Sequence, residues 1–308
     1  MPLRAFIAAL VLAVAHGTAV AADIVGYSEA FDTLFRVDLS THTAQELGAA
    51  GTLNGTRIGD LEGLSFGPDG NLYAVSDGLK ILVRISEQTG HASVIGLLNL
   101  AGEPLTAHLD LAMTFTCDGR LWLSAGDGNF WQVDPATGAT TPVGNLGVKI
   151  TGLTSNGSTV YGTGSQGNNN LYKIDTATAH ATLVGSYNLG TYVTTVSPGF
   201  DATGKLWSIL GYVPPPQGTT TFPPWSDLAS LDLSKGTLTN TGPITGPTDL
   251  QVDFAGGLKG LAIVPPVCSG GGAISVDPTP SLSLQGLLTL AGSLLLLAGT
   301  RLRRRRQN

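Results

Sequence analysis

One short acidic segment holds the residues that could do chemistry. Asp60 and Glu62 stand two positions apart, and Gly63 follows Glu62 directly. Carboxylate oxygens are ligands that Ca²⁺ prefers in proteins. These two residues are therefore the candidate metal ligands, and Ca²⁺ is the one cofactor that the sequence suggests.

Other catalytic signals are weak. The sequence contains neither a phosphate loop nor an HExxH motif, and its histidines are scattered. Its Asp-Gly pairs are better explained as tight turns than as metal ligands. We therefore assign no catalytic residue, and a non-enzymatic protein is favoured over an enzyme.

The charge balance argues against a nucleic-acid partner. Of the 16 basic residues, Arg4 and five arginines between positions 301 and 306 lie near the two ends. The rest of the chain holds 10 basic against 22 acidic residues, a net charge of −12. Binding to phosphates needs a positive surface, so cations or neutral polar partners such as glycans are electrostatically easier.

Five segments of fifteen residues share one pattern. Each has an apolar pair, a Val, Ile or Leu before a mostly acidic position, a turn, and a short strand that ends in Gly. Apolar and polar residues alternate on both sides of the turn, which is typical of a β-hairpin. The segments are residues 34–48, 82–96, 130–144, 171–185 and 228–242.

A second pattern precedes most of these hairpins. It is an apolar strand, a Gly-containing turn and an aromatic-bearing strand, as in residues 62–73. Together the patterns make a four-stranded unit of the size of a propeller blade. The residues after 23 supply three strands of a unit and residues 258–264 supply the missing first strand. We therefore expect an all-β, five-bladed propeller over residues 23–266, with six blades as the alternative if the insertions at 97–105 and 212–225 hide strands.

The units resemble those of the NHL, gluconolactonase-like and PQQ-like propellers, over about residues 24–265. In the gluconolactonase-like family, a Glu before Gly on a first strand binds a divalent metal. The resemblance therefore implies an alternative function, a metal-dependent lactonase-type hydrolase with Glu62 in the central channel. Thr151 and Lys259 stand at equivalent positions. A lysine there competes with a cation, so a solvated channel or an ion pair between Glu62 and Lys259 is the favoured interpretation.

The N-terminal residues predict export. Residues 1–22 combine Arg4, a short apolar stretch, and the small residues Val20 and Ala22 before Asp23. This is typical of a signal peptide that is used by Sec export and removed by signal peptidase.

The C-terminal residues predict a membrane segment. An uncharged run at 284–300 precedes the arginine cluster, so residues 281–308 are expected to form a transmembrane helix with its C-terminus in the cytoplasm. Residues 267–280 are expected to be a flexible Gly/Ser/Pro spacer.

This C-terminal segment resembles the IPTL-CTERM sorting tail, a relative of PEP-CTERM. The resemblance implies processing by a membrane protease of the exosortase type. The protein is therefore expected to stay in the cytoplasmic membrane or to pass to the periplasm or the cell surface. The residues of the motif are Pro280, Ser281, Leu282, Gly286, Arg303 and Arg304.

The sequence contains two cysteines, Cys117 and Cys268. An exported chain permits a disulfide. Each cysteine follows a first strand of the predicted ring, so both should emerge at the same end. We expect them to pair, and two separate thiols are the alternative.

A long insertion at 212–225 is the candidate binding loop. Tyr212, Phe222 and Trp225 place large apolar groups in this connection, and such loops often carry binding residues. The expected partner is a protein, a glycan or a matrix component. A packed lid over a blade is the alternative role for this loop.

Overall fold

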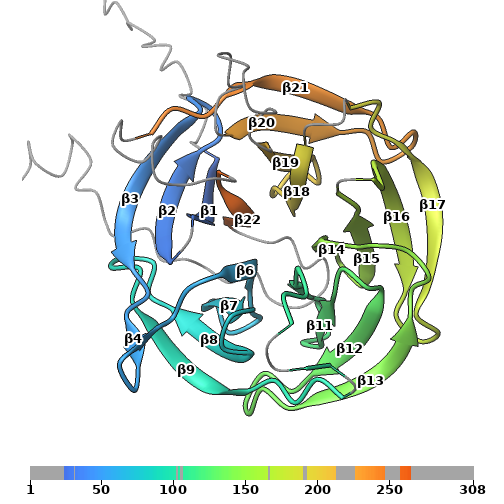
Figure 1. Ribbon diagram of the computed structural model, residues 1–308. Helices are drawn as coiled ribbons and strands as arrows, with labels where there is room; N and C mark the ends of the chain where they lie inside the picture. The colour runs from blue at the N-terminus through green and yellow to red at the C-terminus, as the bar shows by residue number, and fades with distance from the viewer. Residues whose placement is uncertain are drawn as a thin grey trace, which may run out of the picture.

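The computed structural model is a ring of five antiparallel sheets of four strands each (Figure 1). Each sheet is one blade of a β-propeller. The described residues thus form the predicted five blades and not six. They are residues 24–30, 32–101, 103–104, 107–165, 167–189, 193–212, 226–246 and 257–264.

Within each blade the strands follow one another from the channel outward. Blade 1 contains β22 (Lys259–Val264), β1 (Val25–Ala30), β2 (Thr33–Asp38) and β3 (Thr43–Ala49). Blade 2 contains β6 (Leu61–Phe66), β7 (Leu72–Ser76), β8 (Ile81–Ile85) and β9 (Ala92–Leu97). Blade 3 contains β10 (Ala112–Phe115), β11 (Leu121–Ser124), β12 (Asn129–Val133) and β13 (Thr140–Asn145). Blade 4 contains β14 (Gly152–Asn156), β15 (Thr159–Thr163), β16 (Asn170–Asp175) and β17 (His180–Ser186). Blade 5 contains β18 (Val193–Phe200), β19 (Leu206–Tyr212), β20 (Ser226–Leu231) and β21 (Leu238–Pro243). A short hairpin of β4 (Thr52–Leu53) and β5 (Thr56–Arg57) lies between blades 1 and 2 in the sequence.

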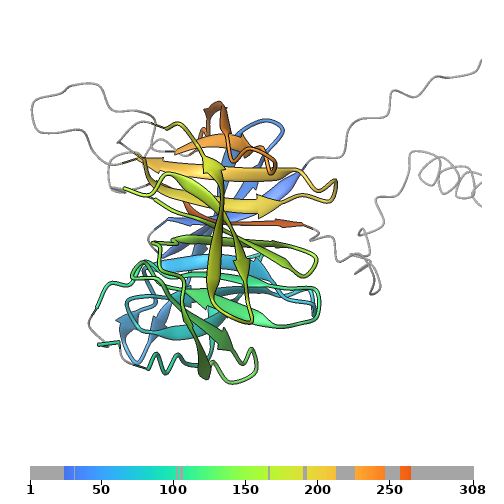
Figure 2. The same cartoon turned by 90° about the vertical axis from the view of Figure 1, so that its right-hand side faces the viewer.

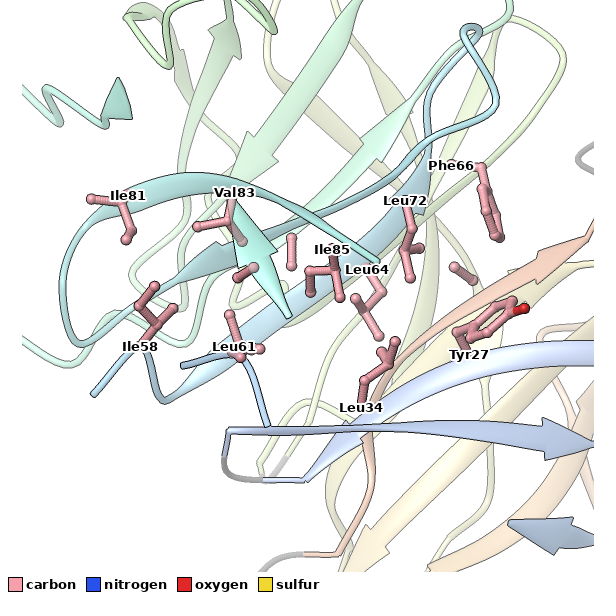
Figure 3. Close-up of a cluster of buried hydrophobic side chains, with 14 residues drawn as sticks. Tyr27, Leu34, Ile58, Leu61, Leu64, Phe66, Leu72, Ile81, Val83 and Ile85 are labelled. Atoms are coloured by element: carbon pink, nitrogen blue, oxygen red, sulfur yellow. The ribbon is translucent and has the colours of Figure 1, made fainter. Parts of the chain in front are cut away.

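The core of the ring lies between the blades. Apolar side chains from blades 1 and 2 face one another, among them Tyr27, Leu34, Leu61 and Leu64 (Figure 3). Tyr27 meets Phe66 edge to face, with ring centroids 5.8 Å apart. The second strands are largely apolar because neighbouring blades cover both of their faces; every residue of β7 is buried.

Ring closure joins strands from opposite ends of the described chain. β22 pairs antiparallel with β1, with Val25 opposite Val264 and Glu29 opposite Lys259. The Ser28 hydroxyl reaches the carbonyl oxygens of Lys259 and Gly260, each at 2.7 Å. In Figures 1 and 2 the red β22 accordingly lies beside the blue β1. The predicted closing strand is confirmed, and it covers the inner edge of β1, which would otherwise have no partner strand.

The glycine that ends each fifteen-residue segment forms a contact between neighbouring blades. In every blade the pairing of the third and fourth strands shifts at this glycine, which is a β-bulge. The glycine then lies against the turn between the third and fourth strands of the next blade. We call these five pairs the rim contacts: Gly48 with Gly90, Gly96 with Thr137, Gly144 with Ala179, Gly185 with Lys235, and Gly242 with His42.

The fold prediction was wrong in adding a transmembrane helix to the propeller. The described residues contain strands and turns without a helix. None of the described segments is a helix that could span a membrane. The longest described strand has eight residues. The described residues therefore form an all-β propeller.

Several predicted features fall outside the described residues. They are the signal peptide at 1–22, the spacer at 267–280, the segment at 281–308 with its sorting motif, Phe222 and Trp225 of the candidate loop, and Cys268.

Candidate functional site

The first strands of the five blades surround the channel, and glycines let them approach closely. A Cβ atom added at Gly63 would overlap the backbone of Met113 on β10, and one at Gly152 would lie 2.5 Å from the Val196 carbonyl oxygen on β18. Gly63 and Gly260 also have positive φ angles of 59° and 63°, which favour glycine. The residues that precede Gly63, Gly152 and Gly260 all line a recess at one end of the channel.

We call this end, where the first strands begin, the channel mouth. It contains a recess of about 470 Å³, part of which is open to solvent. Glu62, Thr151 and Lys259 all line it, as their equivalent positions in the repeat predict. Leu111 occupies the matching place in blade 3.

Glu62 and Lys259 form an ion pair at the centre of the mouth. The Lys259 Nζ atom lies 2.9 Å from Glu62 Oε1 and 3.5 Å from Asp60 Oδ1. The other Glu62 oxygen accepts a hydrogen bond from the Leu111 amide at 2.5 Å. The sequence favours such an ion pair, or a solvated channel, over a metal site at this position. The Lys259 ammonium lies where a metal cation would otherwise bind.

Burial sets the protonation of this pair. It raises the pKa of Glu62 to about 8, against the lowering effect of the Lys259 ammonium. Burial alone would lower the pKa of Lys259, but the neighbouring carboxyl groups of Glu62 and Glu29 outweigh it and raise that pKa. Lys259 is thus charged at neutral pH, while Glu62 changes its protonation state close to neutral pH.

A second acidic group lies beside the pair. Side-chain oxygens of Asp60 and Asp77 and a ring nitrogen of His108 lie within 4.8 Å of one another, a spacing that could hold a metal ion. However, Asp77 is buried and forms an ion pair with the buried Lys80, and Lys259 reaches Asp60. Two ammonium groups therefore already neutralise the carboxylates that a cation would need.

Lys80 also positions the segment that carries His108. Its Nζ atom donates to the side chain and the carbonyl oxygen of Asp77 and to the Ala107 carbonyl oxygen. Asp77 in turn accepts a hydrogen bond from the Leu109 amide at 2.8 Å. Sequence reasoning missed this brace, because the Asp-Gly pair at 77–78 indicates only a turn.

The outer part of the mouth places acidic groups beside nitrogen-bearing side chains. Asp110 lies 3.0 Å from Lys149, and His108 lies 3.5 Å from Asp60 with an 84% exposed side chain. Asp110 thus faces an ammonium group and Asp60 an imidazole ring, so the mouth offers both hydrogen-bond donors and acceptors.

Three threonines of the recess have buried hydroxyl groups. The Oγ1 atoms of Thr151, Thr194 and Thr195 have no hydrogen-bond partner among the described residues. All three residues line the recess. Such groups are uncommon in folded proteins, and they add local polarity to a recess that also contains leucines.

Ser65 matches the spacing of a nucleophile elbow but not its structure. Residues 63–67 read Gly-Leu-Ser-Phe-Gly, whereas an elbow requires a sharp turn between a strand and a helix. Ser65 lies within β6, and its hydroxyl accepts a hydrogen bond from the Phe115 amide at 3.1 Å. It therefore links two first strands and does not stand at a nucleophile elbow.

The remaining predicted site residues are only partly described. Tyr212 ends β19, and its hydroxyl donates to Asp227 at the start of β20, so it is tied into blade 5. Cys117 follows β10, and its amide donates to the Gly157 carbonyl oxygen. Because Cys268 lies outside the described residues, the Cys117–Cys268 disulfide stays a prediction.

The topology and the site together define the class of the protein as a five-bladed β-propeller with a charge-paired channel mouth. No family model matches the chain. No curated protein matches it either.

Solved structures with a similar arrangement are distant in sequence. One chain of a nidogen/laminin complex is 14% identical over 80% of this chain and 99% of its own, with a TM-score of 0.47. A proposed gluconolactonase is 17% identical over 73% of this chain and 80% of its own, with a TM-score of 0.42. Virginiamycin B lyase from Staphylococcus aureus is 15% identical over 70% of this chain, with a TM-score of 0.41. This chain spans 64% of the lyase's length. The assignment of the fold rests on the sheet topology of the chain itself.

Proposed function

We propose that the protein is a non-enzymatic binding module that takes a neutral, hydroxyl-rich ligand, such as the end of a glycan, at the channel mouth. The observation that carries this proposal is the Lys259 ammonium between Glu62 and Asp60. The ammonium lies where a catalytic metal cation would bind. The acidic side chains of the mouth therefore already have a basic partner. Paired donors and acceptors suit a polar ligand without net charge.

The accessible polar groups of the mouth support this ligand class. The side chains of Lys259, Asp60, Lys149 and Asp110 are between 32% and 54% exposed. Asp60, Lys149 and Asp110 could each exchange part of their present pairing for a ligand hydroxyl, because the groups that face them are also partly exposed. The recess beneath them has room for a small group rather than for a whole protein segment.

A glycan array and calorimetry on the purified protein test the proposal. The matched variants are Lys259→Met, in the mouth, and Lys173→Met, which removes an exposed lysine from the outer part of blade 4. We expect a bound glycan whose affinity falls at least tenfold with Lys259→Met and stays unchanged with Lys173→Met. Equal affinities for both variants would place the ligand elsewhere on the ring.

A metal-dependent lactonase-type hydrolase is the second candidate function. The spacing of Asp60, Asp77 and His108 favours it, while Lys80 and Lys259 oppose it. Calorimetric titration with Ca²⁺ separates the two candidates. Saturable Ca²⁺ binding that Asp60→Asn abolishes, together with lactone hydrolysis, would replace the binding proposal.

We also propose that the protein is exported, because residues 1–22 have the charge, length and small residues of a signal peptide. N-terminal sequencing of the protein from its native host tests this. A mature chain that begins at Asp23 is expected, and an intact Met1 would contradict it.

A further inference from the structure

Glu29 on β1 is a buried carboxyl group without a hydrogen-bond partner among the described residues. The residue is fully buried, and the absence of a partner holds for both of its carboxyl oxygens. Buried polar groups are normally hydrogen-bonded, and a buried charge is costly unless it is paired. The Glu29 side chain is therefore most easily accommodated as a neutral, protonated acid.

The charged groups around Glu29 come from three elements. Across the closing sheet stands Lys259 on β22, whose ammonium is already bound to Glu62 and lies near Asp60. Asp32, in the turn after β1, is paired with Arg57 at 3.1 Å. The Lys259 ammonium thus has three carboxyl groups near it, those of Glu62, Asp60 and Glu29. It lies within ion-pair distance of Glu62 and Asp60 but not of Glu29.

The surroundings favour the neutral form of Glu29. Burial raises its pKa well above the usual value of 4.5, and Lys259 only partly offsets this. Glu62, Asp60 and Asp32 raise the pKa further by repulsion. In the unfolded chain these influences are absent, so the folded and unfolded states bind the Glu29 proton with different affinity.

We propose that Glu29 makes closure of the propeller ring depend on pH. With its proton the side chain fits between the closing sheet and blade 2, and loss of the proton weakens the attachment of β22. We expect β22 to detach first, because its pairing with β1 is irregular between Tyr27 and Glu29. This irregularity lies next to the Glu29–Lys259 pair. This inference is independent of the proposed ligand.

The direction of the effect follows from the raised pKa. Because the folded state holds the proton more tightly, the stabilising contribution is complete below the unfolded pKa of about 4.5. It decreases as the pH rises toward the folded pKa. The ring should therefore close more firmly in acidic surroundings than in alkaline ones.

Thermal unfolding of the full chain at pH 5.5 and pH 8.5 tests the pH dependence. The control is Glu46→Gln, which neutralises an exposed carboxyl on the outer strand β3. We expect the Tm of the wild type and of the control to fall by several degrees from pH 5.5 to pH 8.5, and Glu29→Gln to reduce that fall. The fall that remains is the contribution of Glu62, whose raised pKa of about 8 lies in the same range. Parallel pH dependence of the wild type and Glu29→Gln would overturn the proposal.

Hydrogen exchange tests whether the effect lies in ring closure. With intrinsic exchange rates corrected for pH, β22 of the wild type should lose protection at pH 8.5 while β14 on blade 4 keeps it. Glu29→Met, with an apolar side chain of similar length, should keep β22 protected at both pH values, and it also serves if Glu29→Gln fails to fold. Equal loss of protection in β22 and β14 would show a global effect and contradict the assignment to closure.

Discussion

The rim contacts and the channel mouth belong to the same blades, but they differ in how closely they repeat. At the rim, every blade presents a glycine at a bulge to the turn of the next blade. At the mouth, the matching positions hold Glu62, Leu111, Thr151 and Lys259. The rim must be uniform because it joins equal units, whereas the mouth is free to differ from blade to blade. The residues that give this propeller its own chemistry are therefore those that break the repeat.

The largest effect is expected for Lys80, which lies beside the channel mouth. Its replacement should lower the free energy of unfolding at least as much as a substitution at the rim. Lys80→Met leaves the buried Asp77 carboxylate without its ammonium partner, and breaking a buried ion pair costs about 3–5 kcal/mol. Denaturant unfolding measures the loss. Lys149→Met is the control, since its exposed pair with Asp110 should contribute less than about 1 kcal/mol. Similar losses for the two variants would mean that Lys80 is not a brace.

Gly185 is the rim glycine at which an added side chain should be tolerated least. A Cβ at Gly185 would overlap the Lys235 carbonyl oxygen of the next blade, and we expect Gly185→Ala to lower the free energy of unfolding by about 1–3 kcal/mol. The nearest atom to a Cβ at Gly59 is 3.8 Å away, so Gly59→Ala should stay within about 0.5 kcal/mol of the wild type. Chemical denaturation of both variants decides the point, and a neutral Gly185→Ala would show that the rim contacts can accommodate a side chain.

Replacing Lys259 should change the protonation of Glu62 more than it changes the free energy of unfolding. Lys259→Met removes the ammonium that holds down the pKa of Glu62. We expect the pKa of Glu62 to rise from about 8, so that the side chain is neutral over a wider pH range. Carboxyl titration followed by NMR measures this shift. An unchanged or lower pKa would show that the two side chains do not interact in solution.

The smallest effect is expected at a hydroxyl of the recess. The Thr151 Oγ1 atom is buried and has no partner among the described residues, so Thr151→Val loses no hydrogen bond there. The free energy of unfolding should change by less than about 0.5 kcal/mol or increase slightly. Thermal melting provides the measurement, and a clear loss of stability would reveal a hydrogen bond to that hydroxyl.

The repeated positions could be predicted from sequence, whereas the contacts between loops could not. Gly48, Gly96 and Gly185 recur at the ends of similar segments, which marks the blades and their number. Lys259 could be aligned with Glu62 for the same reason, since both precede a glycine on a first strand. The contact of Lys80 with Ala107 leaves no such trace, because Ala107 lies 27 positions further on, in the connection between β9 and β10 and outside the repeated segments.

Glu29 lies between these two cases. Strand alternation places it on the same face of β1 as Tyr27, and Tyr27 is part of the core between blades 1 and 2. Burial of Glu29 could thus have been inferred from the residue spacing. Its lack of a hydrogen-bond partner among the described residues could not have been inferred from the sequence. It arises because the Lys259 side chain points toward Glu62 on β6.

The pairing of β22 with β1 also has a consequence for the order of folding. Blades 2 to 5 are each made from one continuous stretch of chain, so they can form by local contacts. Blade 1 needs partners more than 200 positions apart, such as Ser28 and Lys259. Long-range pairing of this kind slows folding. Refolding should therefore show an early phase, in which four blades form, and a slow last phase in which the ring closes.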